Sequence, residues 1–176
     1  AAYVVNAYAE RDLARVILRH GDERFASRMS AAIVAARPIE TTTRLAEVVT
    51  AAIPAAARRT GGHPAKRTFQ AIRIEVNAEL EALPDAIDGA IDALAPGGRI
   101  AVLSYHSGED RIVKERIRLA QTGGCECPPE LPCVCGAVQT VRIVRGPKRP
   151  SPAEQADNRR AASARLRVAE RLAEQG

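Results

Sequence analysis

The hydrophobic period of the chain changes once, and this change constrains the fold more than any other feature. Up to Leu94, apolar side chains recur at helical spacing, whereas residues 99–105, after a turn at 95–98, form a short and nearly continuous apolar run. Such a run predicts a strand that is buried on both faces. The charged segment 109–119 then predicts a helix, and helix, turn, buried strand and helix in this order are typical of an α/β fold.

The part of the chain before this turn is predicted to be helical. Apolar side chains recur three and four residues apart in five segments, and Pro or Gly residues end several of them. These segments cover residues 12–19, 23–36, 41–52, 67–83 and 84–94. An Arg-, Gly- and Pro-rich stretch at 58–64 follows the third segment. We therefore expect an all-α module over residues 1–62 and a second domain over residues 63–176.

Two later segments show weaker patterns. Residues 137–144 alternate between apolar and polar side chains, which predicts a strand. The last segment fits two structures, because Ala162, Leu166, Ala169 and Leu172 have helical spacing while residues 166–170 could form a terminal strand.

Composition excludes several classes of protein. Hydrophobic residues make up 46% of the chain but aromatic residues only 3%, so the core must consist of Ala, Leu, Ile and Val. No apolar run approaches the roughly 20 residues of a membrane span, and the N-terminus lacks the pattern of a signal peptide. We therefore expect a cytoplasmic protein without a membrane partner. The only Met is Met29, within a predicted helix, so we also expect the chain to be a piece of a longer polypeptide.

The net charge of +5 is concentrated in one stretch. Residues 140–167 hold eight basic residues against Glu154 and Asp157. Such an excess predicts a surface that binds a polyanion, and a solvated basic tail is the alternative. Lys66 and Arg67 also stand at a predicted helix N-terminus, where two cations oppose the helix dipole unless an RNA phosphate or a carboxylate such as Glu81 pairs with them.

The segment 104–111 lies where the predicted strand ends and a helix begins. Ligands bind outside the carboxyl ends of strands in open α/β sheets, and a helix start adds free backbone N–H donors. The candidate site residues here are Ser104, His106, Ser107 and Asp110. Alternatively, Ser107 and Asp110 cap the helix while His106 bonds to the backbone. A hydrolase is the least favoured possibility, because the Gly-x-Ser-x-Gly elbow is absent.

The sequence has no recognisable cofactor loop but does have a compact cysteine cluster. Neither Gly-x-Gly-x-x-Gly nor a Walker-type loop occurs. The loop at 123–136 contains all four cysteines, which are Cys125, Cys127, Cys133 and Cys135. Four thiols this close could hold one Zn²⁺, remain reduced on a surface loop or form disulfides, and the last is disfavoured without a secretory signal.

Three segments together resemble one known family. They are residues 62–77, which begin Gly-His-Pro-Ala-Lys-Arg-Thr-Phe-Gln, residues 94–99 (Leu-Ala-Pro-Gly-Gly-Arg) and residues 104–114, which begin Ser-Tyr-His-Ser-Gly-Glu-Asp-Arg. Through these segments the chain resembles the bacterial small-subunit ribosomal RNA cytosine-N4 methyltransferases, the RsmH or MraW family. Segments 1–6, 38–42 and 164–170 are similar too, so the likeness runs the full length in order. Tyr105 stands where Phe is usual, and Gly108 where Leu is usual.

The resemblance implies an S-adenosylmethionine-dependent enzyme that methylates the exocyclic N4 of a cytidine. Its fold would be α/β, with residues 63–176 forming the C-terminal half of a doubly wound methyltransferase sheet and residues 1–62 an inserted all-α module for RNA recognition. The family's Gly-rich cofactor loop and active-site strand precede the insert, so this chain would carry no cofactor-binding residues and would be inactive alone. The resemblance also favours the strand over residues 166–170.

Further expectations concern residue roles and partners. Ser104, His106, Ser107 and Asp110 would orient the target base. Small-subunit ribosomal RNA would contact seven basic residues, which are Lys66, Arg67, Arg111, Arg142, Arg145, Lys148 and Arg149. A half-sheet exposes an edge and an apolar face, so the chain should associate with its missing N-terminal half or with itself. The alternative function is a zinc-stabilised RNA-binding or interaction module without catalysis.

Overall fold

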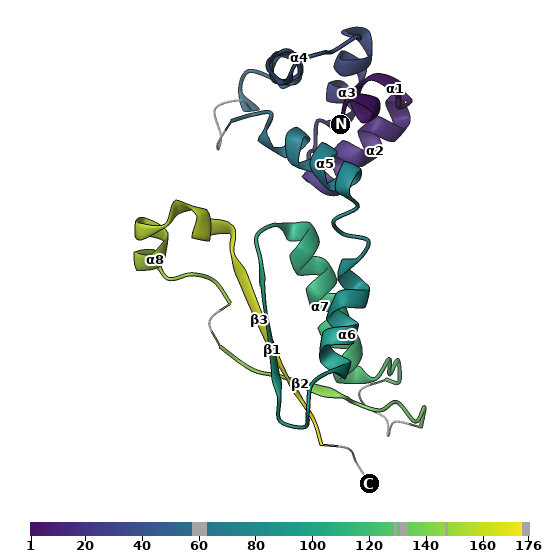
Figure 1. The fold of residues 1–176 in the computed structure, drawn as a ribbon, viewed down its shortest axis with the longest axis vertical. Helices are drawn as coiled ribbons and strands as arrows, with labels where there is room; N and C mark the ends of the chain where they lie inside the picture. The colour runs from purple at the N-terminus through teal and green to yellow at the C-terminus, as the bar shows by residue number, and fades with distance from the viewer. Residues whose placement is uncertain (58–62, 129, 131–133, 147, 174–176) are drawn as a thin grey trace. The chain divides into compact units, whose positions relative to one another are not determined.

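The computed structural model describes residues 1–57, 63–128, 130, 134–146 and 148–173, and it divides the chain into two compact units. Residues 1–79 form the first unit (Figure 1). Its helices are α1 (Ala2–Ala7), α2 (Glu10–Gly21), α3 (Ala26–Ala35), α4 (Thr42–Ala52) and α5 (Lys66–Asn77). Their apolar faces meet in one core, in which Leu13, Ile17, Met29 and Ile33 are fully buried. The helical predictions for this part are confirmed, and α1 is an additional helix.

Helix α5 belongs to the first unit, so the boundary between the two units lies later in the chain than the sequence predicts. The two units separate after Glu79, whereas the sequence predicts a boundary after residue 62. The reason is the close packing of α5 on α2, where a Cβ added to Gly21 would lie 2.8 Å from the carbonyl oxygen of Arg67. Helix α5 is also shorter than predicted, because Ala78 adopts a left-handed conformation (φ 51°) and ends it.

The second unit begins at Leu80 and contains a three-stranded sheet. Its elements are α6 (Leu83–Asp92), β1 (Arg99–Ser104), α7 (Ser107–Thr122), β2 (Val141–Ile143), α8 (Pro152–Asp157), the 3-10 helix η2 (Arg159–Ser163) and β3 (Arg165–Arg171). The strand order is β1-β3-β2, and β3 runs antiparallel to both neighbours. This arrangement confirms a mixed α/β fold with a terminal strand at residues 165–171, while the doubly wound sheet remains a prediction.

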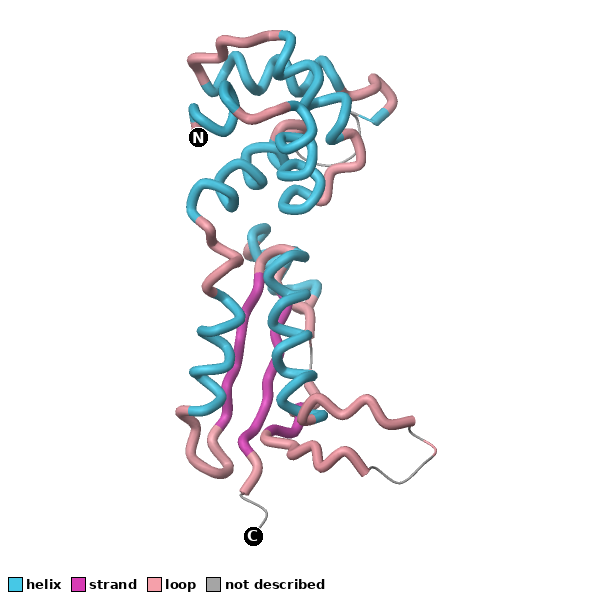
Figure 2. The backbone as a smooth tube through the Cα atoms, turned by 90° about the vertical axis from the view of Figure 1, so that its right-hand side faces the viewer, coloured by secondary structure: helices cyan, strands magenta, loops and turns pink. Residues whose placement is uncertain are grey.

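Both long helices of this unit cover the same face of the sheet (Figure 2). Ile87 and Ile91 of α6 and Val113 and Ile117 of α7 pack on the strands in a core of buried residues that also contains Val141 and Ala169. An ion pair between Asp88 and Arg116 joins the two helices. No helix among the described residues of this unit covers the opposite face of the sheet.

The prediction that residues 99–105 are buried on both faces is therefore wrong. In β1, exposed and partly buried residues alternate, and the Leu103 side chain is 51% exposed. The apolar run has the composition of a fully buried strand, but α6 and α7 cover only one of its faces. The predicted strand at 137–144 is also shorter in the structure, where only Val141–Ile143 pair with β3.

None of the helices in the described residues is long and apolar enough to cross a membrane.

Candidate functional site

His106 organises the turn between β1 and α7. Its Nδ1 atom accepts a hydrogen bond from the backbone N–H of Glu109 (3.3 Å), while the Glu109 carboxylate accepts from the N–H groups of Tyr105 (2.8 Å) and His106 (3.3 Å). This reciprocal capping box starts α7. The structure therefore confirms that His106 bonds to the backbone, but the helix cap is His106 itself and not Ser107 or Asp110, as that alternative predicts.

Two buried polar atoms at this turn have no hydrogen-bond partner among the described residues. They are Ser104 Oγ and His106 Nε2. Because Nδ1 accepts a hydrogen bond, a neutral His106 carries its proton on Nε2. Nε2 lies 3.1 Å from Glu109 Oε1, but this approach is not a hydrogen bond. Buried polar atoms are rarely left unpaired, so this pair marks the turn as a candidate site for a polar ligand.

Asp110 is paired with an arginine of the last strand. Arg167 donates two hydrogen bonds to its carboxylate, from Nε (2.7 Å) and Nη2 (2.8 Å). These bonds lower the pKa of Asp110 below its usual value, and the nearby charges of Arg165 and Lys114 act in the same direction. Asp110 is thus a fixed carboxylate that links α7 to β3 and does not act as a free base.

The residues of this corner line a cavity of about 400 Å³. It contains three of the predicted site residues, His106, Ser107 and Asp110, together with the predicted RNA contact Arg111. The remaining lining residues are Tyr105, Lys114, Ser163, Arg165 and Arg167. Ser104 does not line this cavity and stands at the buried end of β1. Gly108 lies close by, since an added Cβ would be 3.2 Å from both His106 Nδ1 and Leu80 Cδ1.

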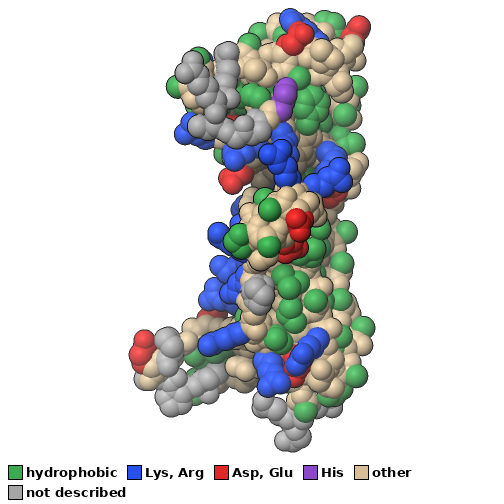
Figure 3. Space-filling model, turned by 90° about the vertical axis from the view of Figure 1, so that its left-hand side faces the viewer, with side chains coloured by type: hydrophobic (Ala, Val, Ile, Leu, Met, Phe, Trp, Pro, Cys, Tyr) green, Lys and Arg blue, Asp and Glu red, His purple; other side chains and the backbone are tan. Residues whose placement is uncertain are grey.

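A second cavity of about 490 Å³ lies between α7, β3 and the segment after β2. Five of its lining residues are cations, which are Lys114, Arg118, Arg145, Lys148 and Arg167. None of the described residues that line it is acidic. We call it the basic cavity. Lys114 and Arg167 also line the corner cavity, so the two cavities adjoin. In the lower part of Figure 3, Lys and Arg side chains gather beside a band of hydrophobic side chains.

The structure sorts the predicted RNA contacts into separate groups. Arg145 and Lys148 line the basic cavity, and Arg111 lines the corner cavity. Arg149 is exposed and lines neither, while Lys66 and Arg67 are exposed at the start of α5 in the first unit, where Arg67 donates to the carbonyl oxygen of Asp22 (3.2 Å).

Arg142 has a different environment from the other predicted contacts. Its guanidinium donates to Glu170 (2.6 Å), which also accepts from Arg99 (2.9 Å). Hydrogen bonds from Arg99 and Arg142 lower the pKa of Glu170. Arg142 is therefore largely neutralised by a carboxylate within this unit, and we do not place it in the basic cavity.

Three cations of the basic cavity are not among the seven predicted RNA contacts. They are Lys114, Arg118 and Arg167. Helical spacing could have indicated Lys114 and Arg118, since both lie on the same face of α7 as the predicted contact Arg111. Arg167 lies in the basic stretch 140–167, but its place beside α7 depends on the pairing of β3 with β1.

The ion pairs of this unit predict acid sensitivity. A carboxyl whose pKa is lowered by folding stabilises the folded protein above its unfolded pKa of about 4, and this stabilisation is lost as the pH falls through the folded pKa. Asp110 and Glu170 both have lowered pKa values. Urea unfolding should therefore show a free energy of unfolding that falls below about pH 5. The Asp110→Asn, Glu170→Gln variant should lose much of this slope, and an unchanged slope would contradict the assignment.

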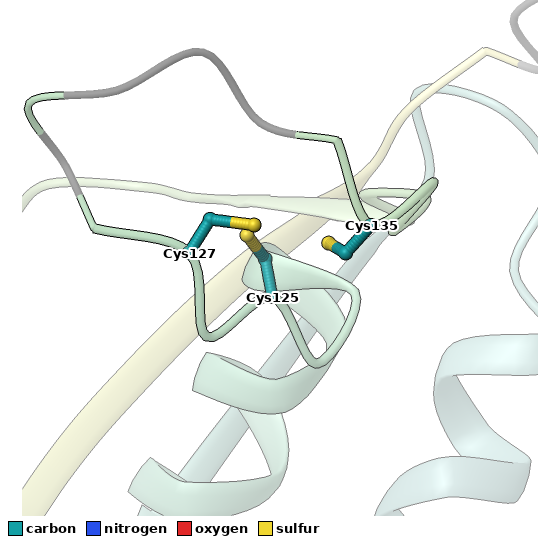
Figure 4. Close-up of side chains that lie close together, drawn as sticks. All are labelled: Cys125, Cys127 and Cys135. Carbon is teal, nitrogen blue, oxygen red and sulfur yellow. The ribbon is translucent and has the colours of Figure 1, made fainter.

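Three cysteines of the loop after α7 lie together. The Sγ atoms of Cys125, Cys127 and Cys135 are all within 4.8 Å of one another (Figure 4). Cys133, the fourth predicted ligand, is outside the described residues. The structure thus brings together every described cysteine of the predicted cluster.

Comparison with known proteins gives the family. Residues 1–172 match the family model described as MraW methylase family. The chain belongs to the MraW methylase family. This confirms the resemblance carried by segments 62–77, 94–99 and 104–114.

Relatives of this MraW methylase chain are identical to it at about half of the aligned positions. It is similar to proteins named ribosomal RNA small subunit methyltransferase H from Symbiobacterium thermophilum (53% identical), Salinispora tropica (54%) and Paenibacillus sp. (51%). The alignments cover 98%, 98% and 96% of this chain but only 55%, 47% and 55% of those proteins. The chain therefore spans about half the length of the curated relatives that it matches.

Proposed function

We propose that the longer protein containing this chain methylates the exocyclic N4 of a cytidine in small-subunit ribosomal RNA, with S-adenosylmethionine as the methyl donor. The observation that carries the proposal is the match to the MraW methylase family over residues 1–172. The names of the relatives supply the RNA class. Within that protein, this chain would bind the RNA and orient the target base, and it would not be competent alone.

The corner residues do not fit a complete cofactor site. S-adenosylmethionine supplies a methyl group on a sulfonium when it is bound. Its ribose hydroxyls need an open acceptor. The backbone of Tyr105 and His106 occupies Glu109 Oε2, and Glu109 Oε1 lies 3.1 Å from His106 Nε2, while Arg167 occupies both oxygens of Asp110. The only glycine of the turn, Gly108, faces His106 and Leu80 at close range. We therefore propose that the cofactor is held mainly by residues outside this chain.

The unpaired polar atoms of the corner suit the orientation of a base. The lone pair of a cytosine amine is delocalised into the ring, so methyl transfer depends on alignment of that amine. The base must also leave its stack to be reached. His106 lines the corner cavity, and its Nε2 N–H can donate to a ring nitrogen or carbonyl of the base. Ser104 Oγ is buried outside this cavity, so a hydrogen bond to it from the exocyclic amine requires the turn to open when the base binds. Ser107, at the first turn of α7, and Asp110, which fixes α7 to β3, would support this position.

The basic cavity suits the RNA backbone. Phosphate contacts supply most of the affinity of nucleic-acid binding through the release of counterions. Arg118, Arg145 and Lys148 face this cavity with no carboxylate among its described lining residues. We propose that the phosphates next to the target cytidine lie here, while the base enters the adjoining corner.

Ser104→Ala should separate stability from activity. Because Ser104 Oγ is buried without a partner, its removal should leave the free energy of unfolding unchanged or raise it by about 1 kcal/mol. Methylation by the longer protein should fall by about 10-fold, as expected for one lost hydrogen bond to the substrate. Ser30→Ala is the matched control, since its buried hydroxyl donates to Ser27 O and its loss should lower stability without slowing methylation. An unchanged rate for Ser104→Ala would remove Ser104 from the site.

The uncovered face of the sheet predicts association of the isolated chain. Leu103 is half exposed on this face, and the outer edge of β1 has no strand partner within the described residues. Sedimentation should show the isolated chain as larger than a monomer, or bound to the rest of the longer protein when that is added. Leu103→Lys should shift it toward the monomer, whereas Leu18→Lys, at an equally exposed leucine of α2, should not. A monomeric unaltered chain would contradict the prediction.

The alternative is a binding module without catalysis, favoured by the cysteine cluster beside a basic surface. Calorimetric titration with S-adenosylmethionine distinguishes the two functions. We expect the longer protein to bind the cofactor and this chain alone to show no binding. Absence of binding to the longer protein would support the module, and tight binding to this chain would contradict our account of the cofactor site.

A further inference from the structure

We propose that Cys125, Cys127 and Cys135 bind a zinc ion, and that this ion stabilises the loop beside the basic cavity. The three Sγ atoms are within 4.8 Å of one another and point toward a common space in Figure 4. They come from the two arms of the loop that joins helix α7 to strand β2 (Figure 2). The inference goes beyond methylation, because no step of methyl transfer needs this ion.

The spacing of the thiols suits a metal ion better than a disulfide. Zinc–sulfur bonds of about 2.3 Å at tetrahedral angles place the sulfur atoms about 3.8 Å apart. The three Sγ atoms would reach that spacing with an inward shift of about 1 Å or less. A disulfide needs a sulfur–sulfur distance of about 2.0 Å and joins only two atoms, so it would leave the third thiol unused.

The backbone holds the two arms of the loop together independently of any ion. Gly123 has a left-handed conformation (φ 60°), and a Cβ added to it would lie 2.4 Å from the carbonyl oxygen of Val138. One step further toward the sheet, the N–H of Thr140 donates to the carbonyl oxygen of Ala120 (2.9 Å). Because the arms are fixed at their base, little conformational entropy is lost when an ion binds between the three cysteines.

Positive φ angles also shape the turns that carry the thiols. Gly124 (φ 77°) precedes Cys125, whose N–H donates to the carbonyl oxygen of Thr122 (3.1 Å), and Gly136 (φ 68°) follows Cys135. Glycine adopts positive φ angles more readily than any other residue. The sequence Gly-Gly-Cys-x-Cys on one arm and Cys-Gly on the other therefore places a glycine of positive φ directly beside Cys125 and Cys135.

The chemistry of the donor set suits zinc. Thiolates are soft ligands that favour zinc, copper(I) and iron–sulfur clusters over magnesium or calcium. Each cysteine that coordinates the ion loses its thiol proton to the solvent, so binding should strengthen as the pH rises. A ligand from outside this set of three completes the tetrahedron.

The position of the loop indicates what the ion does. Gln121, Thr122 and Gln139, from the base of the same loop, line the basic cavity. A metal ion that joins the two arms fixes these residues and thereby one wall of that cavity. None of the three cysteines belongs to either hydrophobic core, so the loss of the ion should loosen the loop without unfolding the protein.

Zinc analysis of the reduced protein tests the proposal. We expect one zinc ion per chain by elemental analysis, and a cobalt(II)-substituted protein with strong thiolate-to-cobalt charge-transfer bands and the visible bands of a tetrahedral ion. The Cys125→Ser, Cys127→Ser, Cys135→Ser variant should bind zinc at least about 100-fold more weakly in competition with a chromophoric chelator, a larger loss than removal of a ligand's hydrogen-bond partner causes. Val134→Ala, an exposed residue of the same loop, is the matched control and should bind zinc normally.

Several results would overturn the assignment. They are a zinc content near zero after reconstitution under reducing conditions, equal zinc affinity in the triple variant and the control, or iron or copper in place of zinc. A disulfide between any two of the three cysteines in the freshly isolated protein would overturn it as well. Circular dichroism and thermal unfolding of the triple variant should match those of the control, which ensures that a lost ion is not the result of a lost fold.

Discussion

The double variant Arg145→Glu, Lys148→Glu of the longer protein should bind small-subunit ribosomal RNA about 100-fold more weakly than the unaltered protein at moderate salt. Both side chains line the basic cavity, and no carboxylate among its described lining residues offsets them. Each lost phosphate contact should also reduce the slope of log affinity against log salt by about 0.7, so the double variant should lose about 1.4. Filter binding or fluorescence anisotropy over a series of salt concentrations measures both quantities.

The control variant changes the net charge by the same amount but at residues outside both cavities. Arg159 and Arg160 lie in the same basic stretch, are exposed, and line neither cavity. Their double reversal to Glu should weaken binding only by the long-range charge effect, which salt screens. Equal losses for the two double variants would mean that total charge and not the basic cavity determines RNA affinity.

His106→Ala should slow methylation by the longer protein by about 100-fold, the loss expected when a reacting group is displaced by about 1 Å. The substitution removes both the cap of α7 and the imidazole N–H that we propose to contact the base. The loss of the cap alone should lower the free energy of unfolding by about 1 kcal/mol. The measurements are the single-turnover methylation rate and the urea unfolding curve of each variant.

His106→Asn separates the two roles of the residue. Asn is among the best helix caps, and its side-chain oxygen can accept the hydrogen bond from the Glu109 N–H. We expect this variant to recover the stability lost in His106→Ala but not the methylation rate. Full recovery of the rate would show that His106 serves only as a cap and does not position the base.

Local sequence patterns predict the helices well because their causes are local. The helices around Leu13, Met29 and Leu45 follow from apolar spacing and from Gly or Pro residues that end them. Helix α5 is predicted too long because Leu80 continues the apolar spacing of Val76 beyond Ala78, where the backbone adopts a left-handed conformation that ends the helix. The capping role of His106 was missed because capping patterns emphasise Ser, Thr, Asp and Asn.

Long-range contacts account for the rest of what the sequence could not predict. The pairing of Asp110 with Arg167 joins residues 57 positions apart and depends on β3 lying next to β1. The apolar composition of β1 cannot show which of its faces α6 and α7 cover. The contact of Gly123 with Val138, which brings the cysteine arms together, is likewise visible only in the folded chain. The site at the end of the first strand therefore stays a prediction from the sequence, while the pairing of its residues is visible only in the structure.

The central claim is the transfer of a methyl group to one atom of ribosomal RNA, and identification of the methylated nucleoside tests it most directly. The longer protein is incubated with unmodified small-subunit ribosomal RNA and isotopically labelled S-adenosylmethionine, and the RNA is then digested to nucleosides for mass spectrometry. We predict that the label appears in N4-methylcytidine and that Arg145→Glu, Lys148→Glu lowers its yield. Label in any other nucleoside, or no label in the RNA, would contradict the account.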